Sequence, residues 1–76
     1  SRQLKDRELE GNVLHELGFN YNKIGQRQKA LEYYNQALPI RREVGDRAGV
    51  AATLNNIGLV YGNIGQRQKA LDYYNR

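Results

Sequence analysis

Apolar residues recur at steps of three and four positions along two stretches of the chain, which is the spacing of one face of an α-helix. In the first stretch these residues are Leu14, Leu17, Tyr21 and Ile24. The second stretch repeats them forty positions later as Leu54, Ile57, Tyr61 and Ile64. Each stretch therefore predicts an amphipathic helix that packs its apolar face on a partner.

A second helix is expected after each of these. Its apolar positions in the first stretch are Ala30, Tyr34, Ala37 and Leu38. Forty positions later, Ala70 and Tyr74 repeat Ala30 and Tyr34. Gly25 and Gly65 stand between the paired helices, where a helix end favours a left-handed residue. Gly45 closes the first pair, and we expect Asp46 to cap the helix that follows.

Two features disturb the helical pattern. Pro39 removes one hydrogen bond and clashes with the carbonyl of Asn35, so it predicts a kink, an early end or a simple bend of its helix. Gly18 and Gly58 each cost about 1 kcal/mol within a helix. We expect a partner helix to approach closely at these glycines, with the small Ala30 and Ala70 side chains facing them.

The two stretches belong to an internal repeat. Residues 24–36 read IGQRQKALEYYNQ and residues 64–76 read IGQRQKALDYYNR. The segments differ only where Glu32 is replaced by Asp72 and Gln36 by Arg76. A helix-pair module of forty residues is therefore used twice.

These residues resemble the signature of the tetratricopeptide repeat (TPR). The positions that match it are Leu14, Leu17-Gly18, Tyr21, Ala30, Tyr34 and Ala37, and again Leu54, Ile57-Gly58, Tyr61, Ala70 and Tyr74. The resemblance implies an all-α fold, an α-solenoid of antiparallel helix pairs with about two repeats plus partial flanking helices. The usual period is 34 residues, and the longer period here is similar to that of kinesin light chain and bacterial multi-repeat regulators.

The repeat pattern also divides the chain. Residues 1–76 form a single fragment of a TPR array, in which residues 1–7 align with 41–47 as the tail of a preceding repeat. The first repeat is expected over 8–45, and a truncated second repeat over 46–76.

Composition narrows the class of protein. A chain of 76 residues without cysteine has no disulfide or thiolate metal site to reinforce it. No apolar stretch reaches the roughly 18 residues of a membrane span, and the first ten residues lack the apolar core of a signal peptide. We therefore expect a cytoplasmic protein that needs no cofactor. The net charge of +4 favours an acidic partner.

TPR helix pairs stack so that their first helices line a concave groove, and the resemblance implies that this groove binds peptide segments of other proteins. Helical geometry, at about 100° per residue, predicts which side chains face away from the packed stripe. The candidate binding residues are Asn12, His15, Glu16, Phe19, Asn22, Lys23, Asn55, Asn56, Leu59 and Asn63.

Some of these candidates have a structural alternative. Asn55 and Asn56 suit the recognition of a peptide backbone because an amide both donates and accepts, but either could instead bridge neighbouring helices. Phe19 and Leu59 are either ligand anchors or packing residues for an adjacent repeat. The Lys and Asn positions of the carboxylate clamp that holds chaperone tails carry other residues here, so chaperone C-termini are not the expected ligand.

The residues favour peptide binding over the other functions that they allow. His15 is the only histidine and is predicted to be solvated, which leaves neither a catalytic constellation nor a metal site. The recurring Arg27 and Lys29 with Tyr33 allow nucleic-acid binding, but we expect these basic residues to lie in turns away from the groove. The stronger alternative is self-association, because open ends would leave Ala70, Leu71 and Tyr74 bare and favour homo-oligomers.

Overall fold

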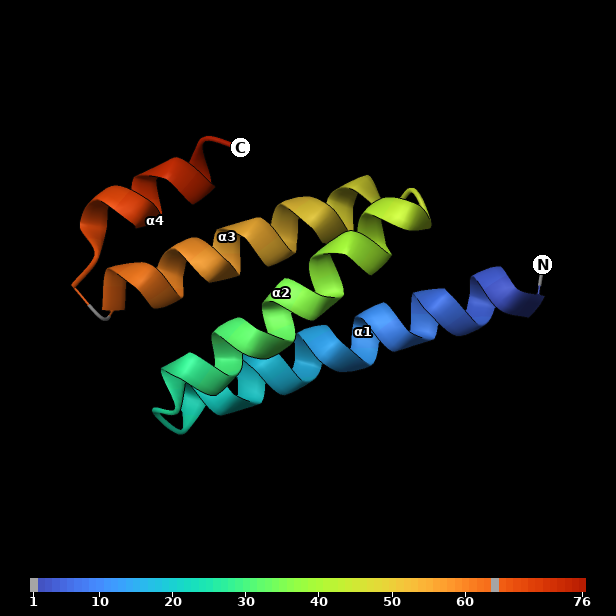
Figure 1. Cartoon of the computed structure of the whole chain (residues 1–76), viewed down its shortest axis with the longest axis horizontal. Helices are drawn as coiled ribbons and strands as arrows, with labels where there is room; N and C mark the ends of the chain where they lie inside the picture. Colours follow the sequence, from blue (N-terminus) through green and yellow to red (C-terminus); the bar gives the residue numbers. More distant parts are fainter. Residues whose placement is uncertain (1, 64) are drawn as a thin grey trace.

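The computed structural model describes residues 2–63 and 65–76, and within them the chain forms four helices and no strand. The helices are α1 (Arg2–Lys23), α2 (Arg27–Glu43), α3 (Arg47–Asn63) and α4 (Arg67–Tyr74). Figure 1 shows successive helices running antiparallel, with α2 between α1 and α3 and with α4 along α3. The all-α architecture of about two helix pairs is confirmed. Ser1 and Ile64 lie outside the described residues.

Left-handed glycines end the first three helices. Gly25, Gly45 and Gly65 have φ angles of 87°, 74° and 82°, a region that only glycine enters without strain. The residue after each glycine donates its backbone N–H to a carbonyl five positions earlier, as Gln26 does to Tyr21 at 2.8 Å. This is the Schellman arrangement, so the predicted helix ends are confirmed. Ile24, predicted on the packed face, is instead exposed in the first of these turns.

Asp46 caps α3 as predicted. Its Oδ1 accepts a hydrogen bond from the backbone N–H of Gly49 at 2.9 Å, which satisfies one of the free donors of the first helical turn. Gln26 and Gln66 precede α2 and α4 without a capping side-chain bond.

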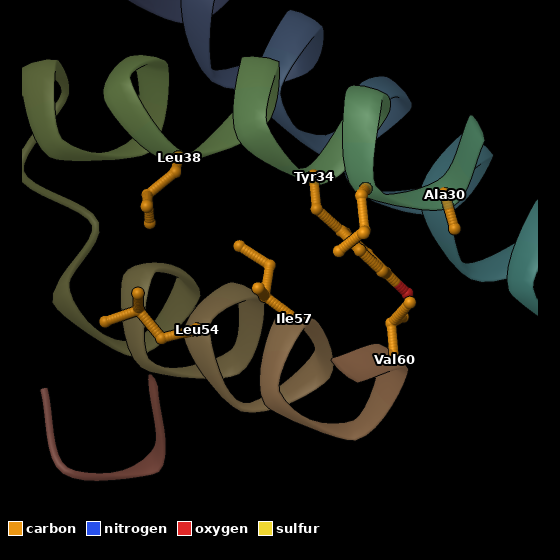
Figure 2. Close-up of a cluster of buried hydrophobic side chains, with 7 residues drawn as sticks. Ala30, Tyr34, Leu38, Leu54, Ile57 and Val60 are labelled. Atoms are coloured by element: carbon orange, nitrogen blue, oxygen red, sulfur yellow. The ribbon is translucent and has the colours of Figure 1, made fainter. Parts of the chain in front are cut away.

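The core lies between the two repeats rather than inside either one. It consists of buried residues from α2 and α3, namely Ala30, Leu31, Tyr34, Leu38, Leu54, Ile57 and Val60. In Figure 2 the labelled side chains of α2 and α3 point toward one another across this interface. Tyr34, Ile57 and Val60 are essentially inaccessible to solvent. Each helix pair therefore buries its apolar face against a neighbouring repeat, as solenoids do.

Gly18 allows the Tyr34 ring to lie directly against α1. A Cβ atom at Gly18 would lie 2.7 Å from both Cδ1 and Cε1 of Tyr34. The expected close approach is confirmed, but its partner at Gly18 is the Tyr34 ring and not Ala30. Gly58 meets Tyr74 in the same way, with Cε1 at 2.8 Å, and here the carbonyl oxygen of Ala70 is also near, at 3.2 Å.

Helix α2 continues past Pro39 to Glu43, so the early end considered for this helix is wrong. Proline costs the helix one hydrogen bond. The next two residues, Ile40 and Arg41, are both buried. Their packing and hydrogen bonds hold the last turn of α2 in place.

Residues 2–7 lie in α1, which runs without a break from Arg2 to Lys23. The assignment of residues 1–7 to the tail of a preceding repeat stays a prediction. The equivalent segment 41–47 turns at Gly45, whereas Lys5 stands at the matching position and gives no left-handed turn. An ion pair of 2.7 Å between Arg7 and Glu43 also holds this part of α1 against the end of α2.

We expect Gly18→Ala to lower the free energy of unfolding by about 1–3 kcal/mol, because the new methyl group overlaps the buried Tyr34 ring. Gly62→Ala is the matched control, because its Cβ would meet only the Ala70 Cβ at 3.9 Å. This control should leave stability unchanged or raise it through helix propensity. Urea titrations followed by circular dichroism measure both, and an equally stable Gly18→Ala protein would contradict the close approach.

Candidate functional site

The candidate binding residues lie on α1 and α3, but they fall into two groups. Seven of them have exposed side chains: Asn12, Glu16, Phe19, Lys23, Asn55, Leu59 and Asn63. The other three are half-buried: His15, Asn22 and Asn56. The exposed group forms the outer face of the two first helices, whereas the half-buried group is partly covered by its surroundings.

His15 is a bridge between the repeats and is not solvated as predicted. Its Nδ1 lies 3.0 Å from Oγ1 of Thr53, and its Nε2 lies 3.1 Å from Nδ2 of Asn56. Because the Asn56 amide donates to Nε2, the neutral ring carries its proton on Nδ1 and donates to Thr53. His15 thus joins α1 to α3 through both ring nitrogens. Its ring also lies 5.2 Å from that of Tyr34.

Asn56 has the structural role that was the alternative to ligand binding. Besides its bond to His15, its side chain is hydrogen bonded to Tyr34. Asn55, one position earlier, is exposed and no hydrogen bond of its side chain is found among the described residues. Of the two asparagines, Asn55 is the one whose amide faces solvent.

Arg41 is a central residue of this region that the sequence analysis missed. Although charged, it is only 9% exposed, because its side chain extends from α2 to a point between α1 and α3. Its Nη1 donates to the carbonyl oxygen of Gly49 at 3.0 Å and to Oγ1 of Thr53 at 3.2 Å. Its Nη2 donates to Oδ1 of Asn12 at 3.0 Å. The spacing from Tyr34 and Leu38 could have revealed it, since Arg41 continues their apolar stripe at a helical step.

The charge of Arg41 influences the neighbouring imidazole. Burial is the main cause that lowers the pKa of His15 from its ordinary value of 6.5, and the nearby Arg41 guanidinium lowers it further. The Glu16 carboxylate acts in the opposite direction. Burial likewise raises the pKa of Tyr34 above 10.0, against the effect of its hydrogen bond with Asn56. The network therefore requires a neutral histidine.

Phe19 and Leu59 are large apolar side chains on the outer faces of α1 and α3. They are 51% and 47% exposed, at positions separated by the forty-residue period. The Nζ of Lys23 lies 5.7 Å from the centre of the Phe19 ring. A large apolar side chain is therefore about half exposed at the same position of both repeats.

Tyrosines and lysines form a second recurring feature. Tyr21 stacks on Tyr33 with ring centres 5.4 Å apart, and Lys29 Nζ lies 5.2 Å from the Tyr21 ring. Tyr61, Tyr73 and Lys69 repeat this arrangement in the second repeat. These rings join the two helices of each repeat. Tyr34 lies in the core as expected, but its equivalent Tyr74 is 44% exposed.

The part of the chain that the structure describes contains no group of three His, Asp or Glu side chains arranged to hold a metal ion. Within the same residues, no helix combines the length and the apolar character needed to cross a membrane.

The tetratricopeptide-repeat family matches residues 6–76, which is nearly the whole chain. The chain belongs to the tetratricopeptide-repeat family. No curated protein and no solved structure matches it significantly. TPR units are non-enzymatic scaffolds that generally mediate interactions between proteins. The resemblance to kinesin light chain stays a prediction.

The His15 bridge of this TPR chain predicts a pH-dependent stability. Because the folded-state pKa lies below 6.5, the unfolded chain binds the proton more readily. The free energy of unfolding should be constant above this pH, fall as pH drops through 6.5, and level off below the folded-state pKa. Urea titrations between pH 7.5 and pH 5 measure the change.

His15→Gln is the control, since this histidine is the only one in the chain and glutamine does not titrate. The variant should lose most of the pH dependence between pH 7.5 and about pH 5.5. An unchanged slope in the variant would show that another group is responsible.

Proposed function

We propose that this TPR chain binds a peptide segment of a partner protein along the outer faces of α1 and α3. The observation that supports this most directly is the pair of exposed apolar side chains, Phe19 and Leu59, at equivalent positions of the two first helices. A peptide crossing both helices would meet one apolar anchor in each repeat.

Two open pockets are lined in part by the same two helices, although neither is lined by Phe19 or Leu59. A pocket of about 400 Å³ is lined by Asn12, His15 and Glu16 together with residues of α1 and α2. A second pocket of about 410 Å³ includes Asn55 and lies between α3 and α4. An amide beside an apolar anchor can hold the backbone of a peptide while its side chain is buried. We therefore propose Phe19, Leu59 and Asn55 as the residues that contribute most to binding.

Replacing both anchors should weaken peptide capture without unfolding the protein. The double variant Phe19→Ser/Leu59→Ser should lose about tenfold or more in affinity for peptides selected from a random twelve-residue library on the unmodified chain. Its melting temperature should change little, because both side chains are about half exposed. Fluorescence anisotropy and circular dichroism measure the two quantities.

Ile24→Ser serves as the control, since Ile24 is also apolar and 66% exposed but lies in the turn after α1. It should bind as the unmodified chain does. Equal losses in both proteins, or no peptide selected at all, would contradict a groove on α1 and α3. Asn55→Ala can then be compared with Asn35→Ala, an exposed asparagine on α2.

Self-association is the second function that a specific observation favours. Leu31 and Tyr34 on α2 are 6% and 1% exposed because α3 covers them. Their equivalents on α4, Leu71 and Tyr74, are 42% and 44% exposed. At the other end, α1 exposes Val13, which corresponds to the buried Thr53 of α3.

Two molecules could therefore pack together in the way that α2 packs on α3 within one chain. The α4 face of one copy would pack on the α1 face of the next, which is a head-to-tail association. This interface joins two different surfaces, whereas a symmetric dimer joins the same surface of both copies. Variants altered on opposite faces should therefore complement each other only in head-to-tail packing.

We expect Val13→Glu and Leu71→Glu each to reduce self-association in sedimentation velocity, because each buries a carboxylate in the same interface from opposite sides. A mixture of the two variants should restore a one-to-one dimer, since one retains an intact α4 face and the other an intact α1 face. Failure of the mixture to associate, while the unmodified chain does, would exclude head-to-tail packing. Ile24→Glu is the control for added charge.

A further inference from the structure

The Arg41 guanidinium is a buried cation without an anionic partner. The ion pairs among the described residues all belong to Arg7, and none involves Arg41. The Asp46 carboxylate, which directly precedes α3, accepts from the backbone N–H of Gly49 as the helix cap. Burial of an unpaired charge is costly, and hydrogen bonds to neutral oxygens compensate for it only in part.

The guanidinium also has donors to spare. Of its five N–H groups, three make hydrogen bonds, to Gly49, Thr53 and Asn12. Its Nε is buried and has no hydrogen-bond partner. A carboxylate would compensate the positive charge better than the neutral amide oxygen of Asn12 that Nη2 now contacts.

Arg41 can be reached from the proposed groove. It lines the pocket of about 400 Å³ that also includes Asn12 and His15. Asn12 accepts from Nη2 at an exposed position on α1, so this bond lies on the solvent side of the guanidinium. The pocket walls include Leu9 and Val13, which are 62% and 50% exposed.

We infer that Arg41 recognises an acidic side chain, an Asp or Glu with an apolar neighbour, in the peptide that binds this TPR chain. The inference rests on the proposed peptide-binding function and adds the chemistry of one ligand position. The carboxylate accepts from Nη2 in place of Asn12 Oδ1, while the apolar neighbour covers Leu9 and Val13. Glu16, an exposed acid lining the same pocket, opposes this binding and limits it to ligands that place the carboxylate next to Arg41.

The test uses three pools of eight-residue peptides, randomised without Asp or Glu except at a central position. The first has a central Glu and blocked ends, the second a central Gln and blocked ends, and the third a central Gln and a free C-terminus. The unmodified chain should bind the Glu pool about tenfold more tightly than the blocked Gln pool. A preference for the third pool alone would overturn the assignment to a side chain.

Arg41→Gln should abolish the preference, so that the Glu pool and the blocked Gln pool bind about equally. Arg42→Gln should retain the preference for the Glu pool. Arg42 is the matched control, because it loses the same charge on the next residue of α2 and is exposed. Glu16→Gln should increase the preference. Loss of the preference in Arg42→Gln as well would mean that net charge alone attracts the peptide, which overturns the inference.

A measurement on the unmodified chain covers the case in which Arg41→Gln does not fold. The Nε–H resonance of Arg41 in a nitrogen-correlated NMR spectrum should shift with the Glu pool and stay in place with the blocked Gln pool. Equal binding of these two pools would refute the role of Arg41 and leave the groove intact. Binding of no pool would refute the groove itself.

Discussion

The fold depends on one contact, the Tyr34 side chain held between two repeats. On one side its ring lies against Gly18, where a Cβ would come within 2.7 Å. On the other side Ile57 and Val60 of α3 enclose it. The first side lies within one helix pair, since Gly18 and Tyr34 stand on α1 and α2, but only α3 of the next repeat closes the second side. The equivalent Tyr74 meets Gly58 in the same way and stays 44% exposed. The second repeat therefore completes the burial of Tyr34, and the contact between modules adds to the stability of each.

Much of this fold was predictable because its signals are local. The left-handed glycines and the Asp46 cap act within four or five residues, so their positions in the sequence are sufficient to place helix ends. The outcomes at Pro39 and at residues 2–7 depend instead on more distant contacts. Burial of Ile40 holds the helix together after the proline, and the ion pair of Arg7 with Glu43 fixes the start of α1 against α2.

The site was only partly predictable, for a geometric reason. A helical projection separates the face that packs on the partner helix from the opposite face, and assigns the latter to solvent. In a solenoid the adjacent repeat covers a third side. His15 and Asn56 lie on that side, which explains why two candidate ligand residues hydrogen bond to one another instead. Arg41 was missed because an arginine is ordinarily assigned to the solvent-exposed face, whereas here the side chain is buried between α1 and α3.

The two repeats agree closely in one segment and differ at the candidate binding positions. Residues 24–36 and 64–76 are nearly identical, although Leu31 is buried and Leu71 is exposed, so this segment keeps its sequence whatever covers it. The candidate binding positions of the first helices do the opposite. They differ between the repeats in every case, namely Asn12/Ala52, His15/Asn55, Glu16/Asn56, Phe19/Leu59, Asn22/Gly62 and Lys23/Asn63. If this face served only to keep the helices in water, interchangeable polar residues would suffice, and neither a phenylalanine nor a leucine would be needed at the same exposed position. Two chemically distinct surfaces on one repeated frame support the proposal of a peptide ligand, whose side chains also differ along its length.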